Sequence, residues 1–166
     1  MARQRHDAGH LPFAAASFDL VALFDVLEHL DDDAACLRDV RRVLRPGGRV
    51  IASVPAYPAL FSNNDRVAGH RRRYTRGSLG AALEGAGLAV ERNTHANVLL
   101  TPLIVPATLA GKLWDATLGR GTESAHTNLS WPLPRPLHGL FYRCFAAELA
   151  LSGTRDIAFG HSIVAI

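Results

Sequence analysis

Two short apolar runs stand out in the first third of the chain. Residues Phe18–Phe24 are apolar except for Asp19, and a second run covers Val50–Val54. Such runs, bounded by loops, are typical of strands buried on both faces of a parallel sheet. Between them apolar residues recur at helical spacing after Asp31-Asp32-Asp33, which supplies an N-cap. The pattern predicts a strand–helix–strand unit with parallel strands and a right-handed crossover.

The rest of the chain predicts further elements of an α/β fold. The first helix is expected to end at Pro46-Gly47-Gly48, because glycine adopts positive φ easily. We then expect a loop over 55–74, a helix after the cap Thr75 that ends at Gly87, and a strand over 88–94. After this strand we expect a helix over 101–118, a loop over 122–136, a helix over 137–151, and a last strand over 156–166 with a bend at Gly160.

Composition indicates one globular domain. The 166 residues are 48% apolar and 20% charged, and the net charge of +3 is too mild to require a nucleic-acid partner. Cys36 and Cys144 form no C-x-x-C motif, so a reduced, cytoplasmic compartment is expected. The histidines show no metal-ligand spacing along the chain, since His6 and His10 lack a third partner. No metal is therefore expected.

Membrane insertion is not predicted. The first seven residues contain no apolar segment of a secretory signal. The longest uncharged apolar run, 98–111, contains two prolines and is shorter than the roughly 20 residues that a span needs. The sequence is compatible with contact between the protein and a membrane surface.

Five motifs occur in an order and spacing that together cover about half of the chain. They are Asp7-Ala8 before Leu11-Pro12-Phe13, Ser17-Phe18-Asp19-Leu20-Val21, Val26-Leu27-Glu28-His29-Leu30, Leu44-Arg45-Pro46-Gly47-Gly48-Arg49, and Gly69-His70-Arg71-Arg72-Arg73-Tyr74-Thr75. This segment resembles the C-terminal half of class I S-adenosylmethionine-dependent methyltransferases of type 11 or 12. The resemblance implies a partial, doubly wound Rossmann-like sheet in which 18–24, 49–54 and 88–94 are the fourth, fifth and sixth strands. Residues 156–166 would be the seventh, antiparallel strand between the fifth and sixth.

The resemblance also implies a cofactor site for S-adenosylmethionine. Asp7 stands where the family places a carboxylate against the adenine amino group, and Ala8 would offer its backbone N–H to the ring. The alternative is a solvated Asp7 near the chain start. Leu23, Phe24 and Asp25 end the fourth strand, where backbone carbonyls in the family receive the ammonium group of the methionyl part.

The acceptor side is expected just beyond these strands. His29 is a candidate general base or acceptor-orienting residue, or alternatively a cap of the 31–33 turn. Tyr57, His70 and Tyr74 are expected to line the acceptor site, with His70 and Tyr74 also as catalytic candidates. Arg71, Arg72 and Arg73 would clamp an anionic substrate, or form a solvated basic turn with one arginine paired to Asp65 or Glu84. Glu28 is expected to be structural or solvated.

The family's glycine-rich turn and the acidic residue of its second strand are not found in the sequence. Only six residues precede Asp7, so we expect that about 60 to 90 residues of βαβ structure are missing. The edge of the strand over 18–24 would then be exposed and able to pair with another chain or a second copy. We expect a single truncated domain over 1–166, with core elements over 1–96, a helical acceptor-side insertion over 97–155 and the final strand over 156–166.

These observations lead to a functional hypothesis with alternatives. The leading interpretation is methyl transfer from S-adenosylmethionine to a small-molecule or lipid- or glycan-linked acceptor. The second is a non-catalytic module that binds another chain through the exposed sheet edge. A short-chain dehydrogenase is disfavoured because no tyrosine is followed four residues later by lysine. Nucleic-acid binding would depend on Arg71–Arg73 alone, without interleaved aromatic residues.

Overall fold

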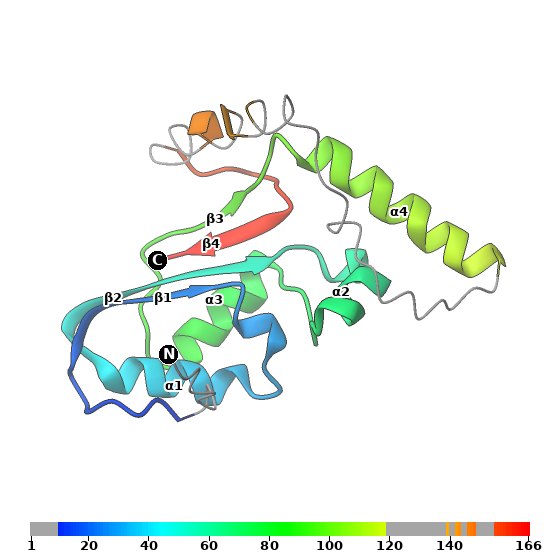
Figure 1. Ribbon diagram of the computed structural model, residues 1–166. Coiled ribbons are helices and arrows are strands. Elements are labelled where there is room, and N and C mark those ends of the chain that lie inside the picture. The colour runs from blue at the N-terminus through cyan, green and yellow to red at the C-terminus, as the bar shows by residue number, and fades with distance from the viewer. Residues whose placement is uncertain (1–9, 119–138, 140–141, 144–145, 149–154) are drawn as a thin grey trace.

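The fold is centred on a mixed four-stranded sheet. The computed structural model describes residues 10–118, 139, 142–143, 146–148 and 155–166. Within them the strands are β1 (Phe18–Phe24), β2 (Leu44–Pro55), β3 (Asn93–Ala96) and β4 (Ser162–Ala165), in the order β1-β2-β4-β3. β1 and β2 are parallel, whereas β4 runs antiparallel to both of its neighbours (Figure 1). This order and these directions confirm the predicted α/β sheet, with its last strand antiparallel between the two strands predicted as fifth and sixth.

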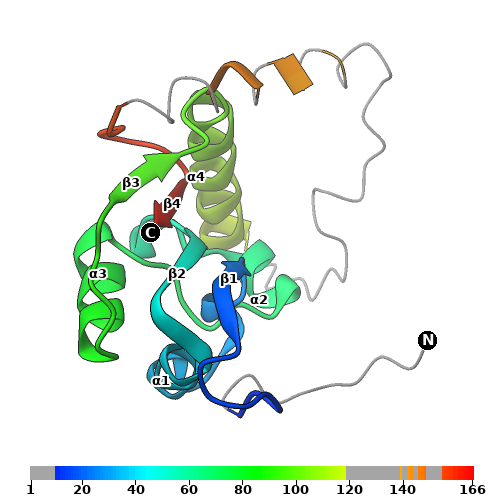
Figure 2. The ribbon, with the colours of Figure 1, turned by 90° about the vertical axis from the view of Figure 1, so that its left-hand side faces the viewer.

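Two helices cover one face of this sheet. α1 (Asp33–Val43) and α3 (Arg76–Gly85) lie side by side below the strands (Figure 1). α2 (Asn63–Ala68) and α4 (Thr101–Leu118) lie beyond the carboxyl end of β2, as Figures 1 and 2 show from two sides. Single 3₁₀ turns occupy Leu27–His29 and Pro58–Leu60. The core between the sheet and the two helices includes Leu23, Leu37, Val40, Val54, Leu79, Leu83 and Ile163.

β1 is buried on one face only. Leu23 contributes to the core, but Leu20 and Phe24 on the opposite face are 53% and 63% exposed. The expectation that this apolar run is buried on both faces was therefore wrong for the described residues, because none of their helices covers the second face. Asp32, by contrast, caps α1 as predicted, since its carboxylate accepts a hydrogen bond from the Ala35 amide.

The first helix ends earlier than predicted. α1 stops at Val43, and Leu44 is already extended and paired with Phe18. The Pro46-Gly47-Gly48 segment, predicted to end the helix, instead forms an irregularity inside β2, with Gly47 at a φ of 78°. A side chain on Gly48 would lie 3.1 Å from the Phe18 carbonyl oxygen, so this close strand approach favours glycine.

Other boundaries also differ from the prediction. The loop over 55–74 contains a 3₁₀ turn and α2, which begins with a capping box between Ser62 and Asp65. The strand expected over 88–94 is instead β3 over 93–96, and the last strand, expected over 156–166, is limited to β4. α3 follows the Thr75 cap and α4 covers 101–118, both as predicted.

Some expectations are not tested by the fold. The loop over 122–136 lies outside the described residues, as does most of the helix over 137–151, although the described residues among 139–148 are helical. The division into core, insertion and final strand stays a prediction. Among the described residues, no helix combines the length and apolar character required to cross a membrane.

Candidate functional site

Three of the four non-glycine residues with positive φ among the described residues lie at one edge of the sheet, and the fourth, Ala16, precedes β1. Asp25, Tyr57 and Asn97 adopt positive φ values of 52°, 62° and 61°, a region that non-glycine residues rarely occupy. Each stands just after β1, β2 or β3, and these three strands point in the same direction. Ligands of open α/β sheets bind beyond such carboxyl ends. Since strained residues cluster at functional sites, this edge is the candidate site.

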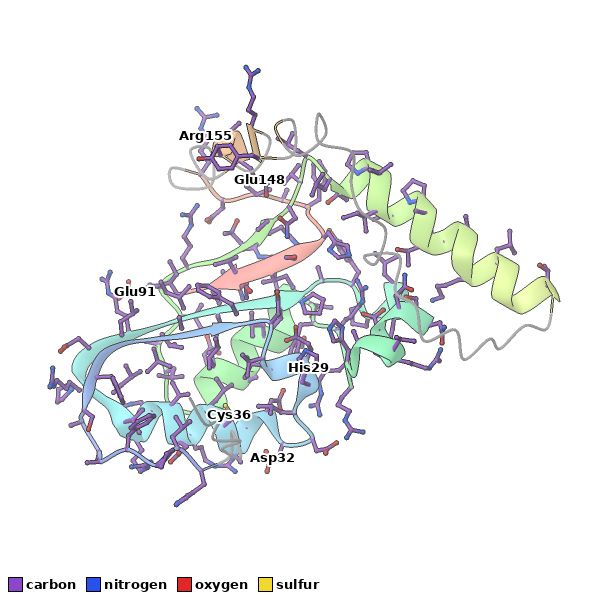
Figure 3. All side chains as sticks on the ribbon, viewed as in Figure 1. His29, Asp32, Cys36, Glu91, Glu148 and Arg155 are labelled. Carbon is purple, nitrogen blue, oxygen red and sulfur yellow. The ribbon has the colours of Figure 1, made fainter. Side chains whose placement is uncertain are left out.

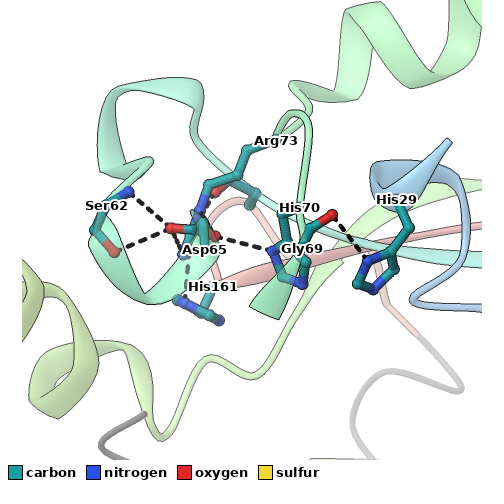
Figure 4. Close-up of polar contacts among 8 residues, drawn as sticks. His29, Ser62, Asp65, Gly69, His70, Arg73 and His161 are labelled. Atoms are coloured by element: carbon teal, nitrogen blue, oxygen red, sulfur yellow. Dashed lines mark hydrogen bonds and ion pairs between the residues drawn. The ribbon is translucent and has the colours of Figure 1, made fainter. Parts of the chain in front are cut away.

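Two segments that are 40 residues apart meet at this edge. The Arg71 amide donates to the Glu28 carbonyl oxygen at 2.7 Å, and His29 Nδ1 lies 3.2 Å from the Gly69 carbonyl oxygen. The imidazole rings of His29 and His70 meet edge to face with their centroids 4.7 Å apart (Figure 4). The structure thus brings together two histidines that the sequence separates. His29 does not cap the 31–33 turn, where Asp32 provides the cap.

A buried carboxylate organises the loop that carries His70. Asp65 is 2% exposed and accepts hydrogen bonds from the Ser62 amide and hydroxyl, from the Arg73 guanidinium, and from His70 Nδ1 at 3.0 Å (Figure 4). Burial by itself raises the pKa of Asp65, but the hydrogen bonds from Arg73 and Ser62 together hold that pKa below its usual value. Asp65 therefore stays charged and fixes the orientation of the His70 ring.

The three arginines of this loop each contact a carboxylate. Arg73 pairs with Asp65, as the basic-turn alternative anticipated, while Arg71 pairs with Asp31 and Arg72 with Asp33. The Arg72 guanidinium also donates to the carbonyl oxygens of residues 30 and 31. These contacts join the loop to the start of α1. They favour a structural role, and the binding of an anionic substrate by Arg71–Arg73 stays a prediction.

The two tyrosines of the predicted site differ in accessibility. Tyr74 is buried, and its hydroxyl donates to Asp33 Oδ2 at 2.5 Å. Burial and the Asp33 carboxylate raise the pKa of Tyr74 far above its ordinary value, so this phenol stays protonated and is a poor base. Tyr57 is half-buried, and its ring stacks on His95 with centroids 5.4 Å apart. Tyr57 thus remains the better candidate to contact a ligand at the strand edge.

Glu28 is the least expected residue of the site. Its side chain is fully buried, and neither carboxylate oxygen has a hydrogen-bond partner among the residues that the structure describes. Burial raises the pKa of Glu28 to about 7, with a further upward contribution from the charge of Asp25. The solvated alternative for Glu28 was wrong, since the side chain is fully buried, whereas a structural role stays a prediction. No motif or residue spacing in the sequence distinguished Glu28 from the other carboxylates.

The structure describes only some of the residues that were predicted to bind the cofactor. Leu23 is buried, whereas Phe24 and Asp25 are exposed at the end of β1. The Asp25 carboxylate accepts a hydrogen bond from the Ser53 hydroxyl at 3.2 Å, and its backbone amide donates to the Ser53 carbonyl oxygen. These contacts hold Asp25 against β2. Asp7 and Ala8 lie outside the described residues.

A shallow hollow exists at the opposite edge of the sheet. It is lined mainly by the amino-terminal part of β2 and by the segment 87–91. Figure 3 shows Glu91 at this edge and His29 at the other. Arg45 and Arg49, which line the hollow, are paired with Asp19 and Glu91. Their charges are satisfied within the fold, so this hollow is a weaker candidate than the strained edge.

Comparisons with known proteins agree with the fold. A family profile described as "Methyltransferase domain" matches residues 2–52. A Mycolicibacterium smegmatis protein named "Probable S-adenosylmethionine-dependent methyltransferase" is 38% identical over 90 residues, which are 52% of this chain and 35% of that relative. The chain therefore spans about a third of the length of this curated relative.

Solved structures show the same architecture. YcgJ of Bacillus subtilis superposes with a TM-score of 0.52 and 19% identity, covering 74% of this chain and 58% of its own. The [4+2]-cyclase SpnF gives a TM-score of 0.52 and 20% identity, covering 96% of this chain and 54% of its own. At these identities the likeness shows the fold alone. The profile match, the bacterial relative and the strand order show that the chain is similar to class I S-adenosylmethionine-dependent methyltransferases.

Proposed function

We propose that this protein takes part in methyl transfer from S-adenosylmethionine to a nucleophile of a small-molecule or lipid- or glycan-linked acceptor. The observation that carries the proposal is the sheet order β1-β2-β4-β3 with strained residues at the shared carboxyl edge. Fold alone does not fix activity, since the similar structure SpnF is named a cyclase. The family match and the chemistry of the edge supply the additional support.

The residues at the end of β1 fit the methionyl part of the cofactor. An ammonium group needs hydrogen-bond acceptors, and the exposed Asp25 carboxylate is one that Ser53 already orients. Asp25 adopts a positive φ directly after β1, and its side chain is exposed. When bound, S-adenosylmethionine supplies a methyl group on a positively charged sulfur, which is already a strong electrophile. Asp7 and Ala8 remain the proposed adenine contacts.

His29 is the proposed proton acceptor. The Gly69 carbonyl oxygen can only accept a hydrogen bond, so the neutral His29 ring carries its proton on Nδ1 and keeps the Nε2 lone pair. The side chain is exposed, so Nε2 can reach an acceptor hydroxyl or amine. His70 is held through Nδ1 by Asp65 and contributes the second ring of the pair.

Cofactor titration tests this function. We expect calorimetry to show binding of S-adenosylmethionine and Asp25→Asn to weaken it about tenfold, because a hydrogen bond to a charged group contributes roughly 1.5–3 kcal/mol. Asparagine tolerates positive φ as aspartate does, so the fold should be kept. Asp19→Asn, near the start of β1 and away from the proposed site, is the matched control and should bind normally. Equal affinity of the Asp25 variant and the parent protein would contradict the assigned contact.

The acceptor is proposed to carry an apolar part. α4 exposes Leu103 and Leu113, which are 64% and 66% accessible. Its Lys112 ammonium donates to the Ala59 carbonyl oxygen, two residues after Tyr57, so the helix lies near the strained edge. An apolar surface next to the proposed site suits an amphiphilic acceptor better than a fully polar one. Methylation assays with acceptor pairs that differ only in an alkyl tail would test this preference.

One observation favours a second function. β1 is an edge strand of the described sheet and presents exposed apolar side chains. A module that binds another chain by strand addition would use such an edge. Absence of cofactor binding, with retained self-association or partner binding, would favour this alternative over methyl transfer.

A further inference from the structure

Three metal-binding groups converge at the strained edge. Glu28, His29 and His70 each offer one ligand atom, and these atoms lie within 4.8 Å of one another. Two atoms bonded to one zinc ion at about 2.0–2.2 Å are at most about 4.4 Å apart. The separations of the three groups are therefore close to those that one bound ion requires. The ligands come from the 3₁₀ turn after β1 and from the loop before α3, so the fold itself assembles them.

Both imidazoles are oriented in the way that metal-binding histidines require. His29 Nδ1 donates to the Gly69 carbonyl oxygen, and His70 Nδ1 donates to the Asp65 carboxylate. Metal-ligating histidines usually donate their second ring N–H to a carbonyl or carboxylate, which fixes the tautomer and raises the basicity of the ligating nitrogen. In each ring the Nε2 lone pair therefore remains available. Figure 4 shows the two rings next to each other with their Nδ1 atoms engaged.

Glu28 provides an independent indication of a cation. Its carboxylate is fully buried, and neither oxygen has a hydrogen-bond partner among the described residues. Burial of an unpaired carboxylate is unfavourable unless a cation or a proton compensates its charge. The position is half-open to solvent, since His70 is partly exposed and His29 is exposed, so an ion could enter from the surface.

We propose that Glu28, His29 and His70 bind a divalent transition-metal ion of the zinc type. Two imidazoles and one carboxylate form a set suited to Zn²⁺ and its neighbours, whereas Mg²⁺ and Ca²⁺ prefer all-oxygen ligands. Three protein ligands leave at least one coordination position for water or for an oxygen of a small molecule. The absence of ligand spacing along the chain concealed the site, because His29 and His70 come together only through the fold.

Metal titration of the complete protein tests the proposal. After treatment with chelator, calorimetry with Zn²⁺ should show one equivalent bound, and Co²⁺ should give the visible absorption of a site with low coordination number. Glu28→Gln keeps the size of the side chain and removes its charge. His29→Gln changes an exposed residue and should leave the fold intact, as circular dichroism can check. Each of these variants, and His70→Gln, should weaken Zn²⁺ binding at least about tenfold.

His10→Gln is the matched control, because His10 is an exposed histidine outside the cluster. It should bind Zn²⁺ as tightly as the parent protein and give the same Co²⁺ spectrum. Lack of stoichiometric binding by the parent, or binding that His29→Gln and His70→Gln both retain, would overturn the proposal. If Glu28→Gln fails to fold, the two histidine variants still decide the outcome.

Metal binding and methyl transfer are separable. An ion bound to His29 would occupy Nε2, the proposed proton acceptor. Proton transfer by His29 would therefore belong to the metal-free protein, and ion binding to the metal-bound protein. Zn²⁺ titration in the absence of S-adenosylmethionine measures the first without the second. Loss of cofactor binding by Asp25→Asn with normal Zn²⁺ binding would show that the two sites fail independently.

Discussion

Cys36 illustrates how burial controls the chemistry of one side chain. It lies in α1 and is 1% exposed. Burial raises the pKa of its thiol to about 11, with further contributions from the charges of Asp39 and Asp33. At pH 8 about one thiol in a thousand would be ionised. We expect iodoacetamide to leave Cys36 unmodified in the folded protein and to alkylate it in denaturant, as peptide mass spectrometry can determine. Rapid alkylation without denaturant would contradict this burial.

The contacts of the Asp39 side chain depend on the charge of its carboxylate and therefore on pH. Its carboxylate accepts hydrogen bonds from the Arg42 guanidinium and from the Leu11 amide, and so holds the segment before β1 against α1. The hydrogen bond from Arg42 lowers the pKa of Asp39 from its ordinary value of 3.8. A lowered pKa in the folded state means that this stabilisation is complete above about pH 4 and is lost as the pH falls through the lowered value.

The corresponding variant is Asp39→Asn. It should melt at a lower temperature than the parent protein at pH 7. The difference should shrink as the pH falls below 3.8, because Asp39 is then protonated first in the unfolded chain and, at its lowered pKa, in the folded parent. Thermal unfolding followed by circular dichroism at several pH values measures this. Asp19→Asn, which removes an exposed ion pair with Arg45, should change stability little at any pH. A pH-independent difference for Asp39→Asn would show that charge is not the cause.

The sequence predicted where some residues of the site lie, but not which of them contact one another. His29 and the end of β1 could be placed because an apolar run and a family motif locate them. The contact of His29 with Gly69 and His70 depends on how the loop over 55–74 folds back, and no local pattern encodes that closure. Asp65 was considered only as an ion-pair partner, although its capping box with Ser62 was readable as Ser-x-x-Asp.

At the scale of elements, two glycines have opposite roles. A Cβ on Gly160, just before β4, would lie 2.2 Å from the Ala96 carbonyl oxygen at the end of β3. A Cβ on Gly85 in α3 would meet nothing within 4 Å. Gly160→Ala should therefore force β3 and β4 apart and cost about 1–3 kcal/mol, whereas Gly85→Ala should stabilise the protein by up to about 1 kcal/mol. Urea denaturation of both variants checks the opposite signs, and destabilisation by both would contradict the account.

Element boundaries were predictable where local signals agree with tertiary pairing. β1 and α4 have the predicted limits because loop or turn signals bound each apolar segment. The strand expected over 88–94 is instead β3 over 93–96, although the Glu91 and Arg92 amides still donate to the Ile166 carbonyl oxygen. An alternating pattern indicates that a strand exists, but the length of β4 decides how far it pairs. The length of a partner strand is not a local property.

At the scale of the whole molecule, the arrangement of the sheet was predictable and the cover of its second face was not. The family motifs implied both the parallel pair β1–β2 and the antiparallel insertion of β4 between β2 and β3. α1 and α3 pack on the same face of this sheet. Along β1, the opposite face exposes Leu20 and Phe24 among the described residues. An edge strand with exposed large apolar side chains is a site for association.

This exposed strand predicts concentration-dependent self-association. Replacing Leu20 and Phe24 together with lysine removes apolar area and places like charges along β1, so association through this strand should weaken. Both side chains are more than half exposed, so thermal stability should change little. Sedimentation velocity over a range of concentrations compares the parent with this variant.

The control is a double lysine variant of Leu103 and Leu113 on α4, which are exposed to a similar degree but lie outside the sheet. If the α4 variant dissociates and the β1 variant does not, association occurs through the helix. The sheet edge would then lose its support as a binding surface. If only the β1 variant dissociates, the uncovered strand is the interface, and its unpaired backbone groups explain why association needs no further element.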